Sequence, residues 1–160
     1  MPFFSSNPSA LVEATFKRIE AERWAGMPML NPVLAVAAVG FERQENEWRG
    51  VLVTPWGISL LLLPAAENWA LPPSHERTFR QYASGTFAFL GNHEDGLGDY
   101  LACPLIHSVS HFADQETAVM TARACLIALD MSPPASELPP RDPQAPASPA
   151  RRGFFTGQRK

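Results

Sequence analysis

A chain of 160 residues, 46% of them apolar and 18% charged, is long enough to bury a hydrophobic core as one domain, without help from a metal or a disulfide. Its net charge of −3 excludes the lysine and arginine density with which proteins bind nucleic acid. The two cysteines, Cys103 and Cys125, are too few for a disulfide framework and too far apart for a paired-cysteine metal site, which favours reduced thiols.

The longest apolar run is interrupted by Pro55 and ends at Pro64, so it is too short to span a membrane. The opening MPFFSSNPSA lacks the basic start and the apolar centre of a secretory signal. We therefore expect a cytoplasmic protein without a membrane span.

The first predicted element is a helix capped by Ser9. Val12, Phe16 and Ile19 recur at helical spacing, and Gly26 with the proline that follows it marks the end.

Three strands are predicted next, over residues 33–41, 48–54 and 58–63. Polar residues 42–47 suggest a loop between the first two, and residues 54–57 suggest a tight turn between the second and third. Because residues 58–63 are apolar apart from Ser59, we expect a central strand covered on both faces.

Residues 64–76, rich in proline, indicate a surface connection. Residues 85–90 form a short predicted strand in which either face could be turned toward the core. A turn over residues 92–98 leads to another strand over residues 100–106.

Asp114 is the predicted cap of a last helix over residues 115–130. Its apolar stripe, expected to face the core, comprises Ala118, Ala122, Cys125, Leu126 and Leu129. The elements together predict a single α+β domain over residues 1–131, with a mostly antiparallel sheet flanked by an N-terminal and a C-terminal helix.

The remaining residues differ in composition. Residues 132–150 contain seven prolines and predict a flexible linker, and residues 151–160 form a basic and aromatic segment. Residues 1–131 carry a net charge of −6 and residues 132–160 one of +3, so the tail can lie on the acidic domain. The sequence Arg151-Arg152-Gly153-Phe154-Phe155 superficially resembles a twin-arginine export motif, without the apolar stretch that such a signal needs.

Few residues suggest catalysis. His107 and His111 have the spacing of metal ligands on a helix, and either could serve as a base for Cys103 as nucleophile. However, Pro104 favours a strand end or loop there, and Cys103 lies in an apolar strand, where a buried structural cysteine is expected. A small cytoplasmic thiol- or metal-dependent enzyme using these three residues is the alternative function.

Two further features have both a structural and a functional interpretation. The cluster His93, Glu94, Asp95 and Asp99 could bind a cation or supply acid and base groups, but its glycines indicate a polar loop. Trp56, beside the rigid Pro55, is either an anchor for a partner or a plug at one end of the sheet.

Four segments carry a family resemblance: GVLVTPWGISLLLLP (residues 50–64), YASGTFAFL (82–90), GDYLACPLIHSV (98–109) and RRGFF (151–155). Their order and spacing resemble the HybE/HupJ family of nickel-iron hydrogenase assembly chaperones. The matching positions, which become the candidate partner-binding residues, are Thr54, Pro55, Trp56, Gly85, Tyr100, Leu101, Cys103, Arg151, Arg152, Phe154 and Phe155.

The resemblance implies a non-enzymatic protein that retains a [NiFe]-hydrogenase precursor in the cytoplasm until assembly is complete. It implies as partner the small, iron-sulfur subunit with its twin-arginine signal, and possible contacts with the large subunit or a rubredoxin-like accessory protein. Rubredoxin-like domains use four cysteine ligands, whereas this chain has two, so we expect no cofactor of its own.

We expect the client to bind an exposed apolar surface near Trp56 and Tyr100. The tail would add a second, tethered contact, so that deleting residues 132–160 would weaken client retention.

Overall fold

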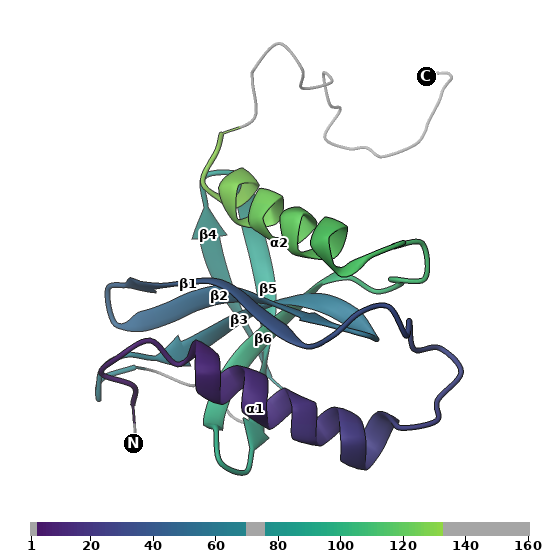
Figure 1. Cartoon of the computed structure of the whole chain (residues 1–160). Helices are drawn as coiled ribbons and strands as arrows, with labels where there is room; N and C mark the ends of the chain where they lie inside the picture. Colours follow the sequence, from purple (N-terminus) through teal and green to yellow (C-terminus); the bar gives the residue numbers. More distant parts are fainter. Residues whose placement is uncertain (1–2, 70–75, 133–160) are drawn as a thin grey trace, which may run out of the picture.

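The computed structural model describes residues 3–69 and 76–132, in which a six-stranded antiparallel sheet lies between two helices (Figure 1). The elements in chain order are α1 (Ser9–Ile19), the π-helical turn η1 (Glu20–Trp24), β1 (Ala37–Gln44), β2 (Glu47–Thr54), β3 (Gly57–Pro64), β4 (Arg77–Tyr82), β5 (Gly85–Glu94), β6 (Gly98–Ile106) and α2 (Gln115–Leu129). This confirms the predicted α+β class and its flanking helices. None of the helices in this part of the chain is long and apolar enough to cross a membrane.

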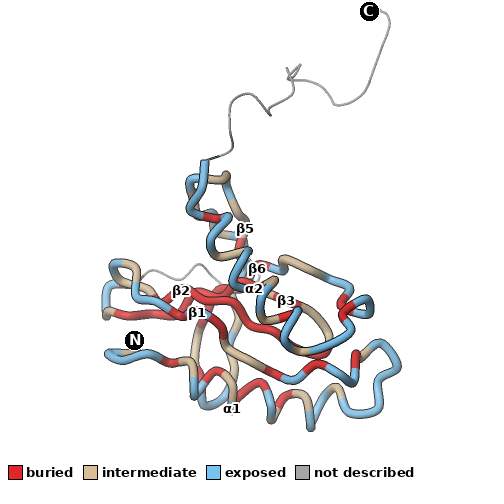
Figure 2. The backbone as a smooth tube through the Cα atoms, turned by 45° about the horizontal axis from the view of Figure 1, so that its top comes forward, coloured by how far each residue is buried: buried red, intermediate tan, exposed pale blue. Residues whose placement is uncertain are grey.

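The strands are ordered β1-β2-β3-β6-β5-β4, and every neighbouring pair is antiparallel. α1 and α2 lie on opposite faces, and the strand direction turns strongly from β1 and β2 to β4 and β5 (Figure 1). β2 and β3 thus lie in the layer between the two helices, and most of their residues are buried (Figure 2).

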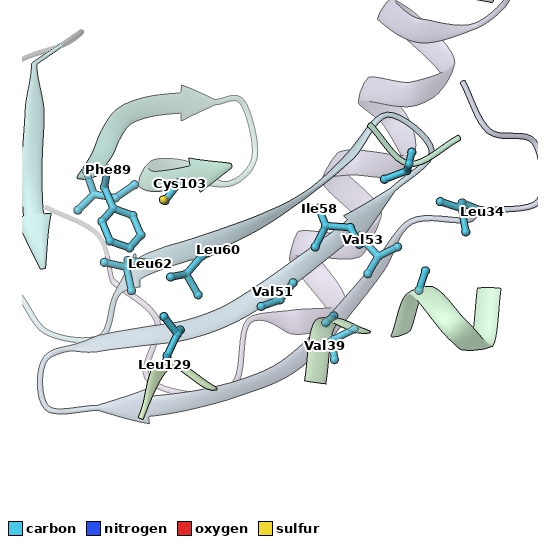
Figure 3. Packing of buried hydrophobic residues seen from close by; sticks show 14 of the residues in the cluster. Leu34, Val39, Val51, Val53, Ile58, Leu60, Leu62, Phe89, Cys103 and Leu129 are labelled. Atoms are coloured by element: carbon cyan, nitrogen blue, oxygen red, sulfur yellow. The ribbon is translucent and has the colours of Figure 1, made fainter. Parts of the chain in front are cut away.

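Alternate residues of β3 face two separate cores. Leu60 and Leu62 pack on the α2 side, near Phe89 and Leu129 (Figure 3), whereas Leu61 and Leu63 pack on the α1 side. All four leucines are at most 1% exposed. The predicted two-sided burial of residues 58–63 is confirmed, because the leucines on both faces of the strand are buried; the one polar residue, Ser59, is half-buried.

The first hairpin differs from its prediction. β1 begins at Ala37 rather than at residue 33, because Asn31 draws residues 33 and 34 into a turn: Val33 N donates to its Oδ1 and Leu34 N to its carbonyl oxygen. The polar residues 42–44 belong to β1, where an edge strand tolerates them. The predicted loop is a tight turn at Glu45, which has a positive φ of 61°.

The connection after β3 was also only partly predicted. Ala65 and Trp69 are buried and anchor the first part of the connection, whereas Glu67 and Asn68 between them are exposed. Residues 70–75 lie outside the described residues. β4 was missed because its sequence, RTFRQY, is that of an exposed edge strand rather than a core strand. In β5, Phe89 faces the α2-side core, and the strand continues to Glu94, so the turn is shorter than predicted.

Of the two predicted helix caps, one is confirmed and the other is wrong. Asp114 Oδ1 accepts a hydrogen bond from Thr117 N at 2.7 Å, which confirms the predicted cap of α2. The prediction for Ser9 is wrong: Ser9 is the first residue of α1, and its backbone N–H donates to Asn7 Oδ1 at 2.9 Å. In the α2 stripe, Ala118, Ala122 and Leu129 are buried, while Cys125 and Leu126 are half-buried.

The predicted linker and basic segment, residues 132–150 and 151–160, lie outside the described residues apart from Ser132.

Candidate functional site

The turn between β2 and β3 is held in one conformation by buried groups. Thr54 Oγ1 donates to Gly57 O at 2.9 Å and accepts from Trp56 N at 3.3 Å. Pro55 is fully buried, and its carbonyl oxygen accepts from Asn31 N at 2.9 Å. The turn therefore presents Trp56 as its half-buried side chain.

Trp56 stacks on Trp24, the last residue of η1, with ring centroids 4.7 Å apart and planes 3° from parallel. Both rings are half-buried and pack against the α1-side core. The π-helical turn widens the end of the helix where Trp24 lies, and such turns are frequent at functional sites. Trp56 thus combines the two interpretations, because one part of the ring packs on the core and the other is accessible.

A hollow of about 300 Å³ opens beside the stack, and we call it the tryptophan hollow. Its lining comprises Trp24, Met29, Trp56, His107, Ser108, Val109 and Ser110. The loop that supplies Met29, 59% exposed, also exposes Met27 and Val33. Exposed methionines adapt to differently shaped apolar partners, so the hollow and its surrounding loop suit an apolar peptide.

The structure does not bring the other candidate residues to this surface. Tyr100 is only 5% exposed and packs edge-on against Phe16 at 6.0 Å between centroids, and its burial raises the pKa of its hydroxyl. The Tyr100 side chain therefore contributes little to any exposed surface, and its role in partner binding stays a prediction. Leu101 and Cys103 are also buried.

Gly85 lies at the opposite end of α2 from the hollow. It follows the β4–β5 turn, where its positive φ of 149° favours glycine. Ser84 N in that turn donates to Leu129 O at the C-terminal end of α2, whereas Ser110 of the hollow precedes its N-terminal end.

Arg151, Arg152, Phe154 and Phe155 lie outside the described residues.

The possible catalytic residues do not form a catalytic arrangement. Cys103 is 8% exposed, and burial raises the pKa of its thiol, which disfavours the nucleophilic thiolate. His111 is exposed with its ring 4.3 Å from that of Phe112, while His107 lines the hollow. Within residues 3–69 and 76–132, no three His, Cys, Asp or Glu residues are placed to hold a metal ion.

The acidic loop after β5 holds η1 in place. Glu94 accepts two hydrogen bonds from Arg23, at 2.7 and 2.9 Å, which lower the pKa of its carboxyl group. Arg18 donates to Asp95 O at 2.8 Å, and His93 Nδ1 lies 2.8 Å from Asp99 Oδ1. These contacts explain the cluster as a structural loop, and they fix the turn that carries Trp24.

Sequence reasoning missed Trp24 and Met29. Trp24 lies five residues after Ile19, a spacing that fits a π turn and not the α-helical period used for the prediction. The tryptophan two residues before the helix-ending Gly26, and the methionines at positions 27 and 29, were the available signals.

Comparison with known proteins identifies the family. The sequence profile of the family described as "[NiFe]-hydrogenase assembly, chaperone, HybE" matches residues 7–157. The chain belongs to this HybE family.

Similar proteins agree with the assignment. The chain is 32% identical over 162 aligned residues to "Protein HoxT" of Cupriavidus necator, with 93% of this chain and 88% of that protein covered. It is also similar to the solution structure of HybE from Escherichia coli, with a TM-score of 0.68, 26% identity and 96% of each chain covered.

A third relative differs in length. The chain is 39% identical over 123 residues to the "Probable rubredoxin HupJ" of Rhodobacter capsulatus, which matches 76% of this chain but only 44% of that protein. The HybE family name describes an assembly chaperone and not a catalyst, so the chain is not assigned an enzymatic activity.

Proposed function

We propose that this HybE-family chain retains a precursor of a [NiFe]-hydrogenase subunit in the cytoplasm, and that the tryptophan hollow is its client site. The favoured client is the small, iron-sulfur subunit with its twin-arginine signal. The observation that carries the proposal is the stack of Trp24 and Trp56, two half-buried aromatic rings at the edge of an accessible hollow. Such rings commonly anchor protein partners.

The chemistry of the hollow matches that of a twin-arginine signal, in which paired arginines precede an apolar stretch. A guanidinium group can stack on the face of an indole ring, and Trp24 and Trp56 offer two such rings. The apolar stretch can contact Met27, Met29 and Val109. Retention then needs only a higher affinity for the immature client than for the mature one, with no covalent step.

Two other partners follow from the family. The large hydrogenase subunit is a second possible client. A rubredoxin-like accessory protein is another partner, because a relative named as a probable rubredoxin matches this chain over less than half of its own length.

The central test replaces Trp56 by alanine. The Trp56→Ala variant should bind the small-subunit precursor at least about tenfold more weakly, because the loss of an aromatic anchor typically costs 2 kcal/mol or more of binding energy. Since the ring also packs on Trp24, the free energy of unfolding should fall by about 2 kcal/mol. Calorimetric titration with the precursor and urea unfolding measure the two effects.

The matched controls separate binding from stability. Trp56→Phe keeps an aromatic ring and should retain most of the affinity, whereas a precursor without its signal should bind the original chain poorly. Full affinity of Trp56→Ala would rule out the hollow as the client site. Failure of the original chain to capture either hydrogenase subunit from a hydrogenase-producing cell would refute the function itself.

A further inference from the structure

We propose that residues 151–155 of this same chain occupy the tryptophan hollow while no client is bound, and that the client must displace them. The inference rests on the proposed function, because it assigns a competitor to the same site. It concerns the regulation of that site rather than the identity of the client, and it is opposed to the expectation from the sequence that the tail adds a second contact for the client.

The chemistry of the tail segment suits the hollow. Arg151 and Arg152 are followed after one glycine by Phe154 and Phe155, so paired guanidinium groups precede apolar side chains. The same order characterises the proposed client signal. A site that accepts arginines on its indole faces and apolar side chains beside Met29 would therefore accept either peptide.

Charge favours the contact within the chain. Residues 1–131 have a net charge of −6 and the tail one of +3. Glu20 and Glu22 lie on η1, four and two residues before Trp24, and neither lines the hollow. Glu22 has only an exposed ion pair with Arg18 at 3.4 Å, and Glu20 forms no ion pair with any described residue. Both carboxylates are thus available to arginines of the tail.

The tail starts from a fixed point. Arg49, whose side chain is 4% exposed, donates to both carboxylate oxygens of Asp130 at 2.8 and 3.0 Å, which ties the end of α2 to β2. α2 has 15 residues and is therefore about 22 Å long, and the hollow lies beyond its N-terminal end.

The predicted linker is long enough to cover this distance. A proline-rich linker of about 20 residues is extended, at about 3 Å per residue, and can therefore span up to about 60 Å. The tail of one molecule can therefore reach its own hollow, at an effective concentration of the order of 1 mM.

This concentration sets the size of the effect. If the isolated segment binds with a dissociation constant of about 100 µM, the tethered segment occupies the hollow about ten times as often as it leaves it empty. The apparent affinity for a client then falls about tenfold. The tail would thus reject weakly binding peptides and release the site only to a stronger one.

The first experiment detects the tail without any client. The full chain is compared by NMR with a variant carrying Arg151→Glu, Arg152→Glu, Phe154→Ser and Phe155→Ser. We expect the indole N–H signals of Trp24 and Trp56 to shift between the two. Those of Trp48 and Trp69 should not move, because their N–H groups donate to Phe4 O and Glu47 Oε1 within the domain.

A charge-matched control carries Arg159→Glu and Lys160→Glu and should leave Trp24 and Trp56 nearly unchanged. Unchanged Trp24 and Trp56 signals in the fourfold variant would overturn the proposal. A shift that grows with protein concentration would also overturn it, because the tail would then bind a second copy.

The second experiment measures competition with a fluorescent synthetic peptide that contains the paired arginines and apolar stretch of the small-subunit signal. The fourfold variant should bind this peptide about tenfold more tightly than the full chain does. Weaker binding by the variant would overturn the proposal, since the tail would then be a second contact for the client. If neither protein binds the peptide while the tryptophan signals respond, tail docking is supported and the proposed client site is refuted.

Discussion

Asn31 is a buried polar residue that joins three segments behind the tryptophan hollow. Its Nδ2 donates to Val109 O at 2.9 Å and to Phe112 O at 3.0 Å, while its backbone N–H donates to Pro55 O. Asn31 therefore connects the loop of Met29 to the turn of Trp56 through its backbone, and to the segment after β6 through its side chain. The segments that line the hollow are therefore held together on its inner side.

We predict that Asn31→Ala lowers the free energy of unfolding by about 2–3 kcal/mol, because it leaves two buried carbonyl groups without their donor. It should also weaken client binding, since the hollow loses the connection between its walls. Urea unfolding and titration with the precursor check both effects. Asn92→Ala is the control: this amide bonds only to Leu90 O two residues away, and a loss as large as that of Asn31→Ala would contradict the assigned role.

At the scale of elements, the two helices start differently. α2 has a side-chain cap from Asp114, whereas at α1 Asn7 accepts the N–H of Ser9 and no side chain caps the helix at Pro8. Hydrogen bonding to Thr117 lowers the pKa of Asp114, which is the direction expected for a carboxylate at a helix N-terminus.

Asp114→Ala should therefore destabilise the protein by about 1 kcal/mol, while Ser9→Ala should have almost no effect. Thermal unfolding of both variants, followed by circular dichroism, compares them directly. An equal loss in the two would mean that the Ser9 hydroxyl has a capping role that its position in α1 does not provide.

The elements also show how far the sequence could predict the structure. The central strand over residues 58–63 and the cap at Asp114 depend on neighbours in sequence, and both were predicted. β4 was missed because its sequence is that of an exposed edge strand, although it pairs with β5 across a tight turn. The partner of Trp56 was missed because the stack joins distant segments. Trp24 and Trp56 are 32 positions apart, and nothing local to either indicates that their rings stack.

At the scale of the whole molecule, the pair of Arg49 and Asp130 connects the end of the domain to the middle of the sheet. Arg49 also lies over the ring of Tyr82, 5.1 Å from its centroid, and burial raises the pKa of Tyr82 to about 12. Hydrogen bonding to Arg49 lowers the pKa of Asp130. The buried guanidinium thus has its countercharge at the surface, where the tail begins.

The lowered pKa gives this pair a definite pH dependence. The contribution of the pair to the free energy of unfolding is fully present above the pKa of aspartate in the unfolded chain, about 4. It is lost as the pH falls through the lower pKa that Asp130 has in the folded protein. Asp130→Asn should reduce the free energy of unfolding at pH 7 by about 1 kcal/mol, because water partly replaces the exposed carboxylate.

The difference in the free energy of unfolding between Asp130→Asn and the original chain should shrink as the pH is lowered below 4. Urea unfolding at a series of pH values measures it, and subtraction removes the contribution of Glu94, whose pKa is also lowered. A difference that stays constant down to pH 2 would mean that the ion pair is not its source.

The two-sided burial of β3 has a consequence for the newly made chain. β2 and β3 are adjacent in sequence and can pair as soon as residue 64 has left the ribosome, since only a two-residue turn separates them. Their α2 side is covered only after Leu129 is synthesised, so an apolar hairpin without prolines inside its strands stays open to other chains in the meantime. A chain that belongs to a family of assembly chaperones thus itself passes through a form with an uncovered apolar surface during translation.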